Sequence, residues 1–360
     1  MRLDAFNYIL PDDRIAQTPL EPRDSARLLH VDPRTGSHSH LIFHQIKDLL
    51  KPGDLLVINE TRVSAVRLVG DGPGGGYREA LVLGPHLPGG PSAYEALVRP
   101  GKAARPGDIL HFATTNLTCT VGDILNEGIR VLHFEGDPEM VRQTLETQGR
   151  VPLPPYIHEH LDDRERYQTV YNRVPGSAAA PTAGLHFTRE LLDTLAETGI
   201  DTARVLLSVG LGTFRPIKCT DDITQHPMHA EYIHVTQETA DKVNACTGRV
   251  IAIGTTSLRA LETAARNAPD GVRVAPFDGD TDIYIYPGQT IKSIDGLLTN
   301  FHQPGSTLLL LVATLLVSMA CIPHTKPPSG MTIASSALEM QCSFCLMRPD
   351  GVESSGDTGS

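Results

Sequence analysis

The chain has 360 residues, of which 40% are hydrophobic and 20% charged, so we expect a packed globular protein of two ordinary domains or one domain with a large insertion. A formal net charge of −11 argues weakly against a nucleic-acid partner, but such binding depends on a local basic patch rather than on the sum. The six cysteines are mostly scattered and the first residues, MRLDAFNYILPDD, lack a long apolar core, so we expect reduced thiols, no signal peptide and a cytoplasmic protein.

The first 150 residues change character near residue 63. Before that point, LIFHQIKDLL (41–50) has helical spacing and LLVINE (55–60) is typical of a buried strand. Between residues 63 and 150, glycine and proline clusters separate short strand-like segments, namely ALVLG, YEALV, DILHF, LTCTV and RVLHF. Short strands with frequent turns favour a small antiparallel barrel or sandwich, and we interpret this region as an inserted β-barrel domain.

From residue 151 the pattern alternates between helices and strands. Helical spacing covers 189–199, 236–246 and 257–267, and strand-like segments cover 203–210, 249–254 and 281–288. This alternation predicts a mixed-sheet α/β domain made of residues 1–62 and 151–322 and interrupted by the barrel domain of residues 63–150. The apolar run Leu308 to Ile322 is too short for a comfortable membrane span, so we expect a buried helix there and no membrane association.

Gly-Thr-Thr-Ser (254–257) lies between a predicted strand and a predicted helix, with Arg259 in the first turn of that helix. Free backbone N–H groups at such a helix start attract anions, and an arginine can bind a carboxylate or phosphate with two hydrogen bonds. Simple helix capping by a hydroxyl side chain explains the same residues equally well.

Several histidines follow small-residue turns. His186 lies in APTAGLHF (180–187), His229 stands two residues before Glu231, and His302 follows Asn300-Phe301. Imidazoles and carboxylates suit general acid–base catalysis near neutral pH. A lone histidine is more often structural, and no HExxH or His-x-His pattern indicates zinc.

Two further motifs are weak. VGLGTF (209–214) allows a backbone to approach a ligand closely, but it lacks the third glycine of a dinucleotide site, so a tight turn explains it better. Cys342 and Cys345 form a CxxC without the second pair that a zinc site requires. The residues considered individually thus indicate an α/β enzyme of unknown substrate.

Taken in order, the same segments resemble the S-adenosylmethionine:tRNA ribosyltransferase-isomerase family. The resemblance extends from residue 1 to about residue 313 and is carried by the stretches IAQTPLEPRDSARLL (15–29), LLKPGDLLVINETRV (49–63), VPLPPYI (151–157), ERYQTVYNRVPGSAAAPTAGLHFT (165–188), VGLGTFRPIK (209–218), HPMHAEYIHV (226–235), IAIGTTSLRALETAA (251–265), DIYIYPG (282–288) and LLTNFHQPGSTLLLLVA (297–313). The match of several long and unusual blocks in order is specific to this family.

The resemblance implies an α/β domain split by a β-barrel. It also implies transfer and isomerisation of the ribosyl part of S-adenosylmethionine onto the 7-aminomethyl-7-deazaguanine wobble base of tRNA, which gives epoxyqueuosine-tRNA, adenine and methionine. It implies no metal and no cofactor beyond the co-substrate S-adenosylmethionine, and we expect a monomer.

The proton transfers of this reaction suit the candidate catalytic residues. These are His186, His229, Glu231 and His302. For substrate binding we predict Thr182, Gly210, Gly212, Thr255, Thr256, Arg259, Tyr167 and Arg62. Among them, Thr255, Thr256 and Arg259 are predicted to hold the methionine carboxylate or an RNA phosphate. Tyr167, together with Tyr171, is predicted to stack on the anticodon loop.

The sequence departs from the family after Ala313. The family continues with a helix and a Tyr-Arg-Phe…Tyr-Gly-Asp-Ala-Met block that this chain does not contain, and residues 323–360 are rich in Ser, Pro and Gly, so we expect a poorly ordered tail. Two alternatives to an active transferase therefore stay open. One is a catalytically impaired homologue that binds tRNA or S-adenosylmethionine, and the other is a conventional methyltransferase.

Overall fold

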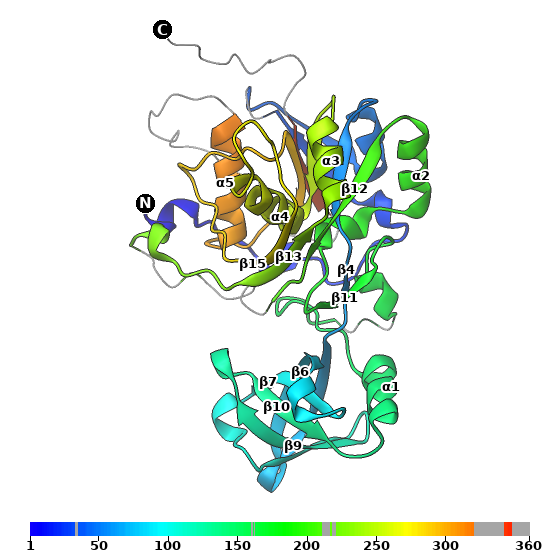
Figure 1. The fold of residues 1–360 in the computed structure, drawn as a ribbon, viewed down its shortest axis with the longest axis vertical. Coiled ribbons are helices and arrows are strands. Elements are labelled where there is room, and N and C mark those ends of the chain that lie inside the picture. The colour runs from blue at the N-terminus through cyan, green and yellow to red at the C-terminus, as the bar shows by residue number, and fades with distance from the viewer. Residues whose placement is uncertain are drawn as a thin grey trace.

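A computed structural model of the chain describes residues 1–32, 35–159, 161, 163–210, 217, 221–319 and 342–347, with backbone only for 317–319 and 342–347. It consists of two lobes, a larger α/β body and a smaller β-barrel (Figure 1). The predicted fold class, a mixed-sheet α/β protein with an antiparallel barrel, is confirmed. The chain enters the barrel after β4 (Thr61–Val63) and leaves it after α1 (Pro138–Gln148).

Within the described residues, the body is built on a nine-stranded sheet with the order β15-β13-β12-β3-β14-β16-β17-β1-β2. Its strands are β1 Arg27–Val31, β2 His38–Ile42, β3 Leu55–Asn59, β12 Asp201–Leu207, β13 Glu231–Val235, β14 Val250–Ile253, β15 Phe277–Thr281, β16 Gly296–Asn300 and β17 Cys342–Met347. The neighbouring strands β12, β3, β14 and β16 are mutually parallel. Their carboxyl ends therefore lie along one edge of the sheet.

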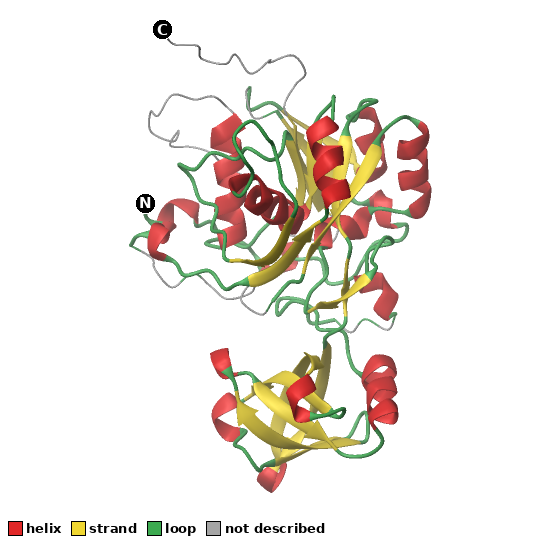
Figure 2. Ribbon diagram, in the orientation of Figure 1, coloured by secondary structure: helices red, strands yellow, loops and turns green. Residues whose placement is uncertain are grey.

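The central strands are apolar because both faces of the sheet are covered. Every residue of β3 and β14 is buried, as expected of parallel strands between two layers. Leu55 and Val57 pack with the residues of α3 and α4, whereas Leu56 and Ile58 pack with α2 and η4 on the other face. The helices flank the sheet (Figure 2) and are α2 Arg189–Glu197, α3 Gln237–Ala245, α4 Gly254–Arg266 and α5 Thr307–Met319.

Two of these helices begin at side-chain caps, and α4 does not. Thr188 Oγ1 accepts a hydrogen bond from the backbone of Leu191 at the start of α2, and Thr236 does the same at the start of α3. The residue before α4, Ile253, has no capping side chain, and Gly254 has a φ of 85°. Short 3-10 helices complete the body: η1 Leu3–Phe6, η2 Asp12–Arg14, η3 Arg23–Ser25, η4 Phe43–Asp48, η9 Arg164–Tyr167, η10 Thr182–His186 and η12 Ile223–Gln225.

The smaller lobe is a closed antiparallel barrel with the strand order β10-β7-β6-β5-β8-β9. Its strands are β5 Val66–Gly72, β6 Gly76–Pro85, β7 Ala93–Arg99, β8 Ile109–Phe112, β9 Leu117–Ile124 and β10 Arg130–Phe134, and its 3-10 turns are η5 Pro73–Gly75, η6 Leu87–Gly89, η7 Gly101–Ala103 and η8 Asn126–Gly128. All five strand-like segments predicted in this region lie in barrel strands. Helix α1, capped by Asp137, packs Val141 and Leu145 against the barrel core.

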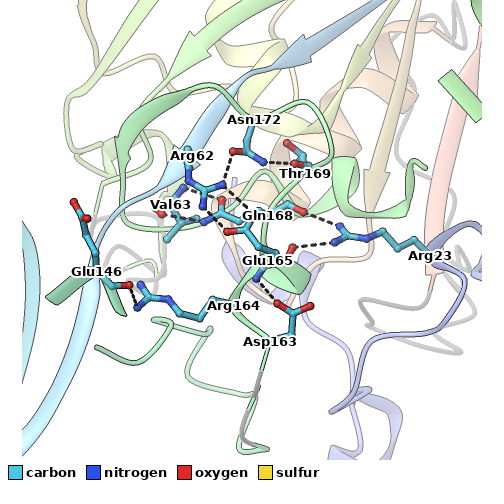
Figure 3. Close-up of polar contacts among 10 residues, drawn as sticks. All are labelled: Arg23, Arg62, Val63, Glu146, Asp163, Arg164, Glu165, Gln168, Thr169 and Asn172. Atoms are coloured by element: carbon cyan, nitrogen blue, oxygen red, sulfur yellow. Dashed lines mark hydrogen bonds and ion pairs between the residues drawn. The ribbon is translucent and has the colours of Figure 1, made fainter. Parts of the chain in front are cut away.

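A polar network lies where the two lobes meet (Figure 3). Strand β4 pairs with β11 (Val174–Ser177), and Gln168 exchanges hydrogen bonds of 2.9 and 3.0 Å with the backbone of Val63. Arg62 on β4 pairs with Glu165 of η9. The strand that leads into the barrel is thus bound to the body on both sides.

Arg164 extends this network to the barrel lobe. Its Nη1 donates to the carbonyl of Gly149, just after α1, at 2.8 Å, and it also donates to the carbonyl of Glu146 (Figure 3). Arg23 of η3 donates to the carbonyls of Gln168 and Glu165 at 2.7 and 2.9 Å. Both ends of the inserted lobe are therefore tied to η9.

Three sequence predictions differ from the structure. The strand predicted at 281–288 is wrong, because β15 ends at Thr281 and the following residues form no strand. Ile283 and Ile285 do alternate with tyrosines, but the isoleucines pack in one apolar cluster and the tyrosines on another. This segment is not paired with a neighbouring strand in the described part of the chain. The helical pattern at 41–50 corresponds only to the 3-10 helix η4, and β17 lies within the 323–360 segment for which we expected little order.

Candidate active site at the carboxyl edge of the sheet

Most of the predicted site residues lie along the carboxyl edge of the parallel strands. Asn300 is the last residue of β16, and Gly254 begins α4 directly after β14. Glu231 is the first residue of β13, which runs antiparallel to β12 and therefore starts at the same edge. Open α/β sheets bind their ligands at this edge, so the topology itself gathers the candidate groups.

His186, at the end of η10, is buried among the residues of this edge. Its Nε2 hydrogen-bonds to Asn300 Oδ1 at 3.0 Å, and its ring packs on Phe43 with 5.2 Å between ring centroids. Burial lowers the pKa of His186 to about 4, although the hydrogen bond to Asn300 opposes this effect. The ring is neutral at physiological pH, and with 1% of the residue exposed it holds Asn300 rather than contacting solvent.

His302 lies two residues beyond the same strand and is partly buried. Its Nε2 lies 3.1 Å from Thr299 Oγ1, and Tyr8 donates a hydrogen bond to its backbone carbonyl. Burial lowers the pKa of His302 to about 4. The last two residues of β16, Thr299 and Asn300, therefore each contact an imidazole whose pKa is lowered.

Glu231 and Arg259 form a second, charged group. Arg259 Nη1 donates to Glu231 Oε2, and both residues are about 5% exposed. The backbone N–H of Gly210 donates to the other carboxylate oxygen of Glu231 at 2.8 Å. Three separately predicted site residues, from the segment after β12, from β13 and from α4, thus meet in space.

This ion pair lines a pocket between α4, α5 and the loops before β13 and after β15. The lining residues are His226, Pro227, Met228, His229, Glu231, Arg259, Ile283, Tyr284, Ile285, Thr307, Leu308 and Leu311. His229 is half-buried there, on the same pocket as Glu231 and Arg259. The pocket combines one buried ion pair with mostly apolar walls.

The start of α4 offers further donors. No side chain among the described residues accepts a hydrogen bond from the first backbone N–H groups of the helix. The hydroxyl side chains therefore do not serve as a simple helix cap. Thr255 is buried, and Thr256 Oγ1 is buried without a hydrogen-bond partner among the described residues. This helix N-terminus suits an anion or a polar ligand group.

The tyrosines do not suit the role predicted for them. Tyr167 is 1% exposed and packs with Val63, Ala180 and Leu185, and Tyr171 is 7% exposed in the core between the sheet and α2. Burial therefore excludes stacking of either ring on a base in this conformation, which corrects our interpretation. The sequence signal was ambiguous because tyrosines serve cores and nucleic-acid surfaces alike.

Three predicted binding residues remain. Arg62 hydrogen-bonds to Glu165 and Asn172 at the junction of the lobes (Figure 3), and it is not among the residues that line the pocket. Thr182 begins η10, which packs against β16 and α4, so it lies beside the sheet edge. Gly212 lies outside the described residues, as does the side-chain placement of Cys342 and Cys345.

The role of Asn300 was not predicted, because its only signal in the sequence was its position at the end of a buried strand. In the part of the chain with described side chains, no group of three or more His, Cys, Asp or Glu residues is arranged to hold a metal ion. None of the described helices is long and apolar enough to cross a membrane.

Comparison with known proteins identifies the family. The sequence matches the family described as queuosine biosynthesis protein over residues 3–322. The chain belongs to the queuosine biosynthesis protein family, and it is an enzyme. A relative in this family from Symbiobacterium thermophilum, named S-adenosylmethionine:tRNA ribosyltransferase-isomerase, is 51% identical over 88% of this chain and 91% of its own length.

Other members of the queuosine biosynthesis family give the same result. A relative of the same name from Acetivibrio thermocellus is 47% identical, again over 88% of this chain and 91% of its own length. A crystal structure of S-adenosylmethionine tRNA ribosyltransferase from Thermotoga maritima is 29% identical, with a TM-score of 0.50 over 95% of this chain and 99% of that chain.

Proposed function

We propose that this enzyme transfers and isomerises the ribosyl moiety of S-adenosylmethionine onto the 7-aminomethyl-7-deazaguanine wobble base of tRNA. The products are epoxyqueuosine-tRNA, adenine and methionine. The observation that carries the proposal is the 51% identity, over 88% of the chain, to a relative that bears the name of this activity. In keeping with scattered cysteines and the absence of a membrane-spanning helix among the described residues, we place the reaction in the cytoplasm, catalysed by a single copy of the chain.

The reaction requires proton transfers rather than a redox or metal step. The sulfonium of S-adenosylmethionine acidifies the carbon next to it, adenine leaves more readily when protonated, and the attacking amine must be neutral. Each task requires an acid or base that is correctly protonated near neutral pH. The cofactor set is thus S-adenosylmethionine as co-substrate alone.

The geometry of the sheet edge supports distinct roles for the candidate residues. His302 and His229 are the best placed to exchange protons with a substrate, because both are only partly buried. His186 is a positioning residue in this scheme, since its Nε2 binds Asn300 and 1% of it is exposed. The start of α4, with Thr255 and Thr256, and the neighbouring Thr182 bind polar groups of the substrates, and Gly210 and Gly212 allow the backbone to approach them.

The proposal is tested by incubating the full chain with S-adenosylmethionine and tRNA that carries the 7-aminomethyl-7-deazaguanine precursor. We expect release of free adenine and methionine and a new ribosyl-derived group on the tRNA. Transfer of a methyl group to the RNA, without adenine release, would instead identify a conventional methyltransferase. Replacing His302 or His229 by Gln and measuring adenine release then tests their roles.

A second candidate function is a catalytically impaired homologue that binds tRNA or S-adenosylmethionine. It is favoured by one observation, namely that the family match ends at residue 322 of 360. Binding of S-adenosylmethionine to the protein without adenine release from precursor tRNA would support it. Adenine release at many turnovers per enzyme molecule would exclude it.

A further inference from the structure

The guanidinium of Arg259 keeps two buried N–H donors unpaired. The residue is 5% exposed, and its Nε and Nη2 have no hydrogen-bond partner among the described residues, whereas Nη1 donates to Glu231. Leaving a buried charged donor unpaired costs free energy, so native proteins rarely do so without a reason. Because Arg259 lines the pocket, the unpaired donors point to a ligand that binds there.

The shape of these donors matches a carboxylate. Nε and Nη2 form one edge of the guanidinium, and other arginines of this protein bind the protein's own carboxylates through this edge. Arg249 donates from Nε and Nη2 to Asp54 at 3.2 and 2.6 Å, and Arg173 donates likewise to Glu60 at 2.9 and 2.6 Å. A carboxylate brought by a ligand fits the same edge of Arg259.

The rest of the pocket fits the remainder of an apolar amino acid. The carboxylate of Glu231 lies beside the guanidinium and offers an acceptor for an α-ammonium group. Met228, Leu308 and Leu311 supply apolar walls, and α5 begins at Thr307 within the lining, so its N-terminus also favours a negative group. An ion pair beside apolar walls is complementary to a zwitterion with an apolar side chain.

We propose that this pocket binds the methionine end of S-adenosylmethionine and the methionine released from it. The fork of Arg259 binds the α-carboxylate, Glu231 binds the α-ammonium group, and the apolar walls contact the carbon chain and sulfur. The identity of the amino acid rests on the proposed function, whereas the carboxylate chemistry rests on the geometry. An RNA phosphodiester carries a ribose on each side and requires an exposed cation, which a guanidinium with 5% exposure does not offer.

Isothermal titration calorimetry of the full chain with L-methionine tests this proposal without catalysis. We expect binding to the unaltered protein, and no measurable binding of L-methioninol, which keeps the ammonium and side chain but lacks the carboxylate. Arg259→Lys keeps the charge but loses the fork, so we expect binding at least about 10-fold weaker. Arg249→Lys is the matched control, because the Arg249 side chain is only 12% exposed and also binds a carboxylate, but it precedes β14 at the opposite edge of the sheet.

The outcomes separate this inference from the proposed function. Equal methionine affinity in Arg259→Lys and Arg249→Lys, or equal binding of methioninol, overturns the inference even when adenine release from precursor tRNA is normal. Loss of methionine binding in Arg259→Lys alone supports it even when no adenine is released. The comparison of the two ligands on the unaltered protein also decides the matter should Arg259→Lys fail to fold.

Discussion

A buried arginine of the barrel and a buried arginine of the α/β body are used in opposite ways. Arg130 of β10 is 8% exposed, and its Nε, Nη1 and Nη2 donate to the carbonyls of Ala104, Gly128 and Gly101 at 2.8, 2.5 and 2.6 Å. Arg259 of α4 is 5% exposed, yet among the described residues only its Nη1 has a partner. Both residues are buried, but only Arg130 has a hydrogen-bond partner for each nitrogen of its guanidinium.

This difference distinguishes a residue that builds the fold from one that is kept for a ligand. Arg130 binds carbonyls of two loops of the barrel through all three guanidinium nitrogens and leaves no donor nitrogen for a ligand. Arg259 lies at the carboxyl edge of a parallel sheet, where ligands bind, and its free fork has no structural use. Burial alone, without the list of hydrogen-bond partners, would have assigned both to the core.

The largest effect is expected at the ion pair of the body. Glu231→Gln leaves the buried guanidinium of Arg259 without its counterion, so the free energy of unfolding should fall by about 3–5 kcal/mol. We also expect adenine release to fall by at least about 10-fold, because the acceptor of the substrate ammonium group loses its negative charge. Urea unfolding followed by circular dichroism, with adenine release measured on the folded fraction, checks both. A loss of stability below about 1 kcal/mol would mean that the pair behaves like a surface pair.

The corresponding change in the barrel should be purely structural. Arg130→Met removes the donors to three carbonyls, and we expect the barrel to lose about 2–3 kcal/mol of stability. Amide hydrogen exchange should quicken in β10, which contains Arg130, and in its neighbour β7, while β3 and β14 in the body keep their protection. Methionine binding should be unchanged. Faster exchange throughout the body would contradict the view that the barrel is a separate core.

The sequence predicted the structure correctly where the local spacing of apolar residues was sufficient to distinguish a helix from a strand. The segment 249–267 reads as a buried strand followed by an amphipathic helix, and the structure has β14 and α4 there. The same reasoning failed at 281–288, where Ile283 and Ile285 pack in one apolar cluster and the alternating tyrosines pack on another, instead of pairing in the sheet. Alternating polarity indicates which side chains are buried, but a segment becomes a β-strand only when its backbone forms hydrogen bonds with a neighbouring strand.

The site could be predicted only in part because its contacts are distant in sequence. Glu231 and Arg259 were each proposed, but their pairing depends on two strands and a helix that fold together. His186 and Asn300 are 114 residues apart, so no local pattern could indicate their hydrogen bond. The sequence likewise does not indicate that the guanidinium donors of Arg130 all have hydrogen-bond partners, whereas two of those of Arg259 have none among the described residues.

A smaller effect is expected when the pH is lowered. The pKa of both His186 and His302 lies near 4 in the folded protein, below the value of 6.5 for an unperturbed histidine. The unfolded state therefore binds more protons between these values, so the stabilisation is present above pH 6.5 and is lost as the pH falls toward 4. Each histidine should contribute a loss of about 2 kcal/mol between pH 6.5 and pH 5.

Replacing His186 by Gln isolates its share of that pH dependence. The glutamine amide can still donate to Asn300 but does not titrate, so the difference in unfolding free energy between pH 7 and pH 5 should shrink by about 2 kcal/mol. The barrel offers a control substitution, since His111 is exposed and His111→Gln measures the general effect of exchanging a histidine for a glutamine. An unaltered slope in His186→Gln would show that folding does not lower the pKa of this ring.

The smallest effect is expected where the two lobes meet. Arg62 and Glu165 are bound by two hydrogen bonds, but their side chains are 37% and 60% exposed, so water and salt screen the pair. A double-mutant cycle with Arg62→Met and Glu165→Gln should give a coupling energy of about 1 kcal/mol or less, and about zero in 1 M salt. A coupling of several kcal/mol that resists salt would mean that the junction, like Arg130, is a structural element of the fold. If the coupling is weak, an anionic partner can displace Glu165 from Arg62, because an exposed ion pair is bound by about 1 kcal/mol or less.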